Sequence, residues 1–174
     1  FSVIENVNLS SETAPFLVPN MFVNYNESSA VVAKARELAQ GAANQGDVVR
    51  NIYQWVVDNI TYDHDKAAQL ASATGYVPDP DATLASGTGI CFDYASLGAA
   101  MLRSLGIPCQ VITGYVSPDD VYHAWNMVYI DGEWISVEIS IKPNSWTRVD
   151  LTFAASGAAS TIGDGTSYTD RYTY

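Results

Sequence analysis

Apolar residues recur at helical spacing in three segments of the first two thirds of the chain. We expect helices over residues 30–40, from just after Asp47 to about residue 60, and over residues 91–105. Asp47 is of the type that caps a helix N-terminus. In the third helix Leu97, Met101 and Leu105 fall every four positions, and the residues at 95 and 98–100 are small, so neighbours can approach closely. This third helix is therefore expected to be central and buried.

Beyond the third helix the pattern changes from helical spacing to alternation. Strands are expected at residues 109–116, 123–130, 133–141 and 146–153. Asp131 and Gly132, between the second and third of these, form a strong two-residue hairpin signal. Helices followed by antiparallel strands predict an α+β fold in which the central helix packs on an antiparallel sheet.

The remaining segments lack a sustained period. Residues 1–28 are interpreted as an N-terminal arm and residues 156–174 as a loosely ordered C-terminal tail. Residues 64–86 contain glycine and prolines, and we expect a loop there with one helical turn near residues 66–70. The whole chain is then one domain, with its core in residues 29–155.

The net charge of the chain argues against some classes of binding partner. The 174 residues include 19 acidic and 8 basic ones, for a net charge of −11, which repels nucleic acid and anionic lipid. No apolar run reaches the roughly 18 residues of a membrane helix, so no membrane insertion is expected. Few lysines, many Tyr, Asn and Thr, and no initiator methionine suggest a secreted or cell-surface bacterial protein that has lost a leader. The oligomeric state is not predicted.

The two cysteines have different surroundings. Cys91 follows a Gly-containing turn and opens the third helix, where unpaired N–H groups and the helix dipole favour a thiolate and can stabilise an oxyanion. The alternative is a small hydrophobic residue that caps the helix. Cys109 begins a strand among apolar residues and is expected to be buried and inert. A disulfide between the two is conceivable.

A thiol nucleophile needs a base, and the base needs an orienting group. His123 begins an expected strand and is the candidate base, whereas His64 lies in a polar loop and is interpreted as solvated. Two carboxylates can orient the base. Asp150 interrupts an apolar strand and so needs a partner, while Glu138 shares its strand face with serines.

Several short blocks resemble the transglutaminase-like superfamily over about residues 47–155. The blocks are the helix exit Ile52–Asp63, the nucleophile helix Gly89–Pro108, the histidine strand His123–Asn126, the hairpin Tyr129–Trp134 and the segment Asp150–Phe153. The resemblance implies a papain-like core and a catalytic triad of Cys91, His123 and Asp150.

Three positions depart from the family pattern. Leu151 stands where proline is usual, and Met127 stands where an acidic residue is common. The gap from His123 to Asp150 is longer than the shortest spacing that the family shows between the histidine and the third residue of its triad. That shortest spacing would make Glu138 the third member of the triad. An additional hairpin accounts for the length, so Asp150 is favoured and Glu138 remains the alternative.

The expected function is cysteine-dependent acyl transfer or hydrolysis on protein or peptide amides through a thioester, as in transglutaminases and cysteine proteases. The alternative is a non-catalytic surface module that binds a partner on the same fold.

A metal site built from two cysteines and two histidines is disfavoured, because no close-paired ligand motif occurs. The acidic pairs at residues 79–81 and 119–120 do not have the spacing of a calcium loop. No metal or other cofactor is expected.

Overall fold

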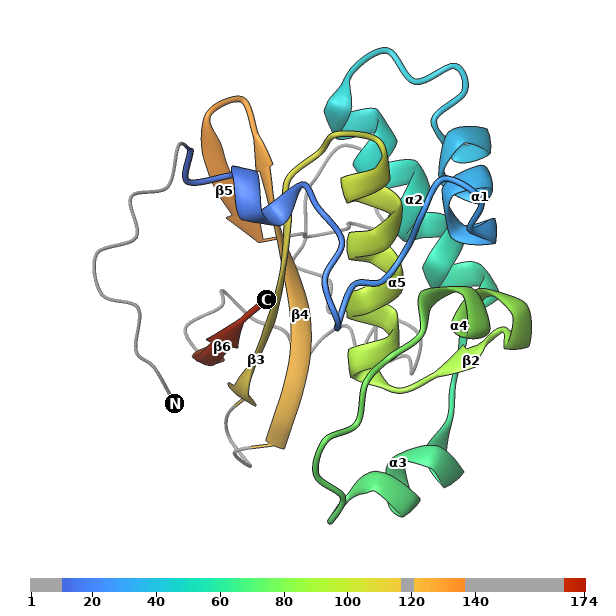
Figure 1. Ribbon diagram of the computed structural model, residues 1–174, viewed down its shortest axis with the longest axis vertical. Helices are drawn as coiled ribbons and strands as arrows, with labels where there is room; N and C mark the ends of the chain where they lie inside the picture. Colours follow the sequence, from blue (N-terminus) through green and yellow to red (C-terminus); the bar gives the residue numbers. More distant parts are fainter. Residues whose placement is uncertain (1–10, 117–120, 137–167) are drawn as a thin grey trace.

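The computed structural model of the protein describes residues 11–116, 121–136 and 168–174. Helices and an antiparallel sheet form two layers, with the main helices gathered on one face of the sheet (Figure 1). The predicted α+β class is thus confirmed. Within the described residues, no helix is both long enough and apolar enough to cross a membrane.

The first two expected helices are present as α1 (Ala30–Leu38) and α2 (Gln45–Asn59). The predicted start of α2 is wrong by one turn. The side chain of Asn44 accepts the backbone N–H of Asp47 at 2.9 Å, so Asn44 is the capping residue and Asp47 lies inside the first turn. Both residue types can cap, and the sequence alone did not separate them.

The segment expected to be a loop contains two short helices, α3 (His64–Leu70) and α4 (Pro80–Ser86). The prediction was right only for the turn at residues 66–70. Each helix follows an aspartate, Asp63 or Asp79, whose carboxylate accepts a backbone N–H three residues later, at 2.8 and 3.1 Å respectively. Such caps stabilise helices too short to persist on propensity alone.

The predicted central helix is α5 (Cys91–Ser104). It contacts α1, α2 and α4 on one side and the sheet on the other (Figure 1). Nearly all of its residues are buried, and the largest belong to the hydrophobic core: Tyr94, Leu97, Met101 and Leu102. The expectation of a central, buried helix is confirmed.

The four-stranded sheet consists of β3 (Cys109–Val116), β4 (Val121–Ile130), β5 (Glu133–Ser136) and β6 (Tyr168–Thr173), in the order β5-β4-β3-β6. All of its pairs are antiparallel. The turn at residues 131–132 has two positive φ angles, 55° and 89°, as the Asp-Gly signal predicts.

Strand β6 corrects the expected C-terminal tail. Residues 168–173 pair with β3, and Tyr174 exchanges two backbone hydrogen bonds with Val111, at 2.7 and 2.9 Å. The tail prediction is therefore wrong for these last residues. The expected strand at residues 146–153 and the end of the strand at 133–141 lie outside the described residues.

The described part of the expected N-terminal arm begins at residue 11 and contains a 3-10 turn, η1, at Ala14–Phe16. It is fixed by the buried side chain of Arg103, which donates to the carbonyls of Val18, Cys109 and Tyr174 at 3.0, 2.9 and 2.8 Å. This guanidinium joins the arm, the start of β3 and the end of the chain. The division into arm, core and tail within a single domain stays a prediction.

Candidate active site

Cys91 is the first residue of α5 and is half-buried. The chain enters the helix through β2 (Thr88–Gly89), which pairs in parallel with β1 (Thr61–Tyr62). Gly89 lies so close to the helix that an added Cβ would be 2.7 Å from the Cβ of Asp93. Only glycine fits at this position without displacing the first turn.

The first turn of α5 offers the electrostatic environment expected for a nucleophile. Helix geometry leaves the N–H groups of a first turn without intrahelical acceptors, and they carry the positive end of the helix dipole. The carboxylate of Asp93 accepts the N–H of Ile90 at 2.8 Å, which fixes the chain just before Cys91. A negative charge on sulfur or on a reacting oxygen is favoured at this end of the helix.

His123 lies on β4, opposite Gly114 of β3, and only 4% of its surface is exposed. Burial lowers the pKa of His123 to about 4, so the imidazole is neutral at pH 7 and can accept a proton. The neighbouring Gly114 has no room for a side chain, because an added Cβ would be 2.0 Å from the carbonyl oxygen of Thr169. β6 thus lies close along the edge of β3 that faces away from the histidine strand, with a shift in register at Thr113 and Gly114.

Asn126 joins the two elements that carry the cysteine and the histidine. Its Nδ2 donates to the carbonyl of Ala95 on α5 and to the carbonyl of Gln110 on β3, both at 3.0 Å. The helix and β4 begin toward the same end of the molecule (Figure 1). Cys91 and His123 therefore belong to the corresponding ends of two elements in direct contact.

The other candidates are placed as follows. Asp150 and Glu138 lie outside the described residues, so the third member of the triad stays a prediction. Cys109 is fully buried, and burial raises the pKa of its thiol to about 12. No disulfide joins it to Cys91. His64 is exposed at the start of α3, and the described residues contain no cluster of His, Cys, Asp and Glu suited to a metal ion.

Sequence reasoning missed a buried polar cluster beside the nucleophile. Asp93 is completely buried and accepts hydrogen bonds from Lys66 Nζ at 2.6 Å and from the hydroxyl of Tyr76 at 2.5 Å. An acidic residue at the third position of a helix is a visible capping signal. Its partners lie 27 and 17 residues earlier, and the local pattern does not indicate them.

The buried histidine predicts a pH dependence of stability. The pKa of His123 is about 4 in the folded state and near 6.5 in an unfolded chain. Below pH 6.5 the unfolded state therefore binds a proton that the folded state refuses, so stability falls as the pH is lowered toward 4. We expect this residue to contribute a loss of up to about 3 kcal/mol.

Chemical denaturation between pH 7 and 4 measures this dependence, and variants isolate the histidine from the carboxylates that titrate in the same window. His123→Gln should flatten the slope, whereas His64→Gln, at an exposed position, should keep it. Equal slopes in the wild type and His123→Gln would contradict the assignment of a buried neutral ring.

Known proteins resemble this chain in sequence. The family model described as Transglutaminase-like superfamily matches residues 32–139. Cytokinesis protein 3 of Schizosaccharomyces pombe is 33% identical over 120 residues, which is 61% of this chain and 12% of that protein. Kyphoscoliosis peptidase of Mus musculus is 31% identical over 112 residues, or 59% of this chain and 16% of that protein. The chain thus spans only a small part of these relatives.

Solved structures resemble it in fold. A candidate cysteine protease from Cytophaga hutchinsonii superposes with a TM-score of 0.62 at 22% identity, over 98% of this chain and 57% of that one. The periplasmic domain of TgpA from Pseudomonas aeruginosa gives 0.54 at 20% identity, over 78% and 46%. The papain-like arrangement of a helix on a sheet is thereby confirmed. Since the sequence relatives are eukaryotic and, in another case, archaeal, the bacterial origin stays a prediction.

Proposed function

Because the chain belongs to the transglutaminase-like superfamily, we propose that it is a cysteine-dependent enzyme that cleaves or exchanges amide bonds through a thioester. The observation that carries the proposal is the position of Cys91 at the start of a buried helix, whose flank is bonded through Asn126 to the strand of His123. His123 on the adjoining strand is buried and its pKa is lowered to about 4, so its ring is neutral at pH 7 and can accept a proton.

The proposed reaction has two halves. His123 accepts the thiol proton of Cys91 while the sulfur attacks the amide carbonyl, and the N-terminal N–H groups of α5 stabilise the oxyanion. The intermediate collapses as the imidazolium returns the proton to the departing ammonia or amine, which leaves a thioester. A water or amine then attacks the thioester, its proton passes to His123 and then to the thiolate, and the thiol is restored. Asp150 is proposed to orient the ring.

The nature of the second attacking group separates a hydrolase from a crosslinker. A similar relative is named a peptidase, and a similar structure is a candidate cysteine protease, which favours water as the acceptor and a protein or peptide substrate. An amine acceptor would make the enzyme a transglutaminase. A secreted or cell-surface location is also proposed, on composition alone.

Alkylation of the native protein with iodoacetamide tests the nucleophile. We expect Cys91 to be modified near neutral pH much faster than an ordinary exposed thiol, because thiolate character controls this reaction. Cys109 should remain unmodified, since it is buried and its pKa is raised to about 12. Peptide mapping by mass spectrometry assigns each modified site.

The matched variants are Cys91→Ser and Cys109→Ser. The first should remove all rapid labelling and any iodoacetamide-sensitive activity, and the second should leave both intact. If Cys109 reacts first in the folded protein, the nucleophile is wrongly assigned. If Cys91 reacts no faster than a simple thiol, the alternative of a non-catalytic binding module is favoured.

A further inference from the structure

Residues 64–77 form an excursion that leaves the body of the protein next to the nucleophile helix. The segment contains α3 and the chain that follows it, and it has no buried residue. Figure 1 shows it beside the N-terminal end of α5, with the ends of β3 and β4 on the opposite side. Burial of apolar side chains therefore does little to hold it in place.

Polar contacts hold the excursion instead, and they converge on a single carboxylate. Lys66 Nζ lies 2.6 Å from Oδ2 of Asp93, and the hydroxyl of Tyr76 lies 2.5 Å from Oδ1. The ammonium of Lys66 also lies 4.9 Å from the centroid of the Tyr76 ring, within the range of a cation–π contact. The two ends of the excursion are thus tied to each other and to the first turn of α5.

The charge states of the partners suit these contacts. Burial alone would lower the pKa of Lys66, but the hydrogen bonds to Asp93 and Tyr76 outweigh it and the pKa is raised, so Lys66 stays cationic. Burial and then the bond to Asp93 raise the pKa of Tyr76 to about 12, so its hydroxyl stays a donor. Charge-assisted bonds of this kind are stronger than neutral ones.

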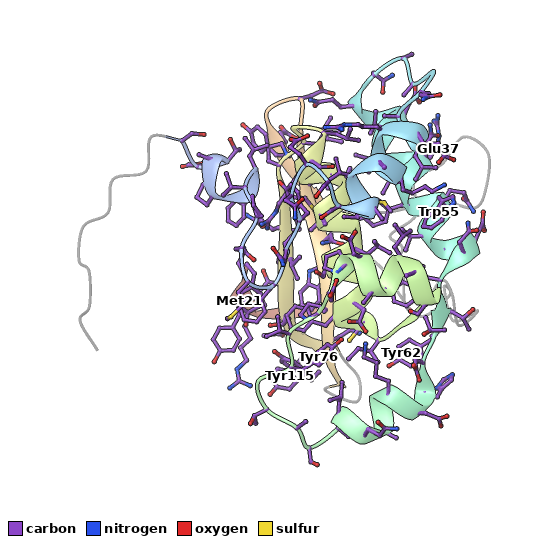
Figure 2. The ribbon with its side chains drawn as sticks, turned by 45° about the vertical axis from the view of Figure 1, so that its right-hand side comes forward. Met21, Glu37, Trp55, Tyr62, Tyr76 and Tyr115 are labelled. Carbon is purple, nitrogen blue, oxygen red and sulfur yellow. The ribbon has the colours of Figure 1, made fainter. Side chains whose placement is uncertain are left out.

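We propose that Asp93 is a positioning residue that holds residues 64–77 against the start of α5, where they form one wall of the substrate site beside Cys91. Figure 2 shows Tyr76 of this segment and Tyr115 of β3 toward the same end of the molecule. The role in substrate access rests on the proposed function, whereas the tether itself does not.

Hydrogen exchange of the backbone amides in residues 64–77 tests the tether. Tyr76→Phe keeps the ring and removes one bond to Asp93, and Lys66→Met keeps the length of the side chain and removes the other. We expect exchange in this segment to become about tenfold faster in each variant, the factor that follows from losing one hydrogen bond to a charged group.

Matched controls are available elsewhere in the chain. Lys34 makes a 2.6 Å ion pair with Glu37 and lies 5.4 Å from the centroid of the Trp55 ring, so Lys34→Met removes the same kinds of contact far from the excursion. It should leave exchange in residues 64–77 unchanged. Exchange at the wild-type rate in both Tyr76→Phe and Lys66→Met would overturn the proposal. Asp93→Asn is less suitable, because its buried position endangers folding.

Two alkylating reagents that react in the same way but differ in size test whether residues 64–77 restrict access to Cys91. In a Cys109→Ser background, the rates of alkylation of Cys91 by iodoacetamide and by its fluorescein derivative give a ratio. We expect the ratio of the rate for the bulky reagent to the rate for the small one to rise severalfold in Tyr76→Phe and Lys66→Met. The ratio should stay unchanged in Lys34→Met. An unchanged ratio despite faster exchange would refute the role in access. Slow alkylation of wild-type Cys91 by both reagents would instead refute the proposed function, while the exchange rates would still decide the tether.

Discussion

Asp150→Asn is expected to lower kcat/KM on a peptide amide by about 10⁴-fold, whereas Glu138→Gln should lower it less than about tenfold. A carboxylate that accepts the second ring N–H fixes the tautomer of His123 and stabilises its imidazolium. An asparagine that presents its NH2 group to the ring in place of an oxygen loses both effects. Asp150 has the better claim, since it interrupts an apolar stretch where a charge needs a partner. Steady-state kinetics of the two variants measures the difference.

Circular dichroism and thermal unfolding are the control, because both variants must be folded for the kinetics to count. If the ranking is reversed, Glu138 is the third member of the triad. If neither substitution matters while Cys91 remains unreactive, the binding-module alternative is supported.

Arg103→Met is expected to lower the free energy of unfolding by about 3–5 kcal/mol. Arg103 is 2% exposed, and its guanidinium donates hydrogen bonds to three backbone carbonyls from three separate segments. Methionine fills much of the space but donates no hydrogen bond, so the buried carbonyl of Cys109 and the partly buried carbonyls of Val18 and Tyr174 lose their partner. An unsatisfied buried group costs about 1–3 kcal/mol. Urea denaturation monitored by tryptophan fluorescence measures the change.

Arg36→Met is the matched control. Arg36 also makes a 2.6 Å contact, with Glu27, but both side chains are largely exposed. Exposed pairs contribute little, so this variant should change stability by less than about 1 kcal/mol. Equal losses in the two variants would show that the three carbonyl contacts of Arg103 do not stabilise the fold.

Much of the fold could be predicted because its signals are local. The apolar spacing of α5 and the alternation of β3 each fall within one element, and the turn at Asp131 and Gly132 requires positive φ angles that these residue types tolerate. Periodicity identified these elements without any knowledge of their neighbours.

The missed elements depend on distant partners. Strand β6 contains exposed polar and aromatic residues, and only pairing with β3 makes it a strand. The helices α3 and α4 are seven residues each, too short for an apolar period to emerge. Their aspartate caps are visible in the sequence, but our prediction assigned Asp63 to the exit of the preceding helix and Asp79 to the loop.

The residues of the candidate site also divide into those with local signals, which could be predicted, and those that depend on distant partners, which could not. Cys91 and His123 were predicted from their residue types and from the elements they begin, and the structure puts them on a helix and a strand in contact. The roles of Asn126 and Asp93 could not be predicted, because each bonds to groups 16 or more residues away. The third member of the triad remains a prediction from the resemblance and from local polarity.

The placement of β6 has a consequence for chain entropy. In the β3–β4 hairpin, Val116 pairs with Val121, whereas in the β3–β6 pair the same Val116 pairs with Tyr168, 52 positions along the chain. Closing a loop about ten times longer costs about 2 kcal/mol more, because the cost grows with the logarithm of loop length. The bonds that Tyr174 makes with Arg103 and Val111 at the end of β6 offset that cost. Among the pairs of strands that the structure describes, β3 and β6 thus close the longest loop.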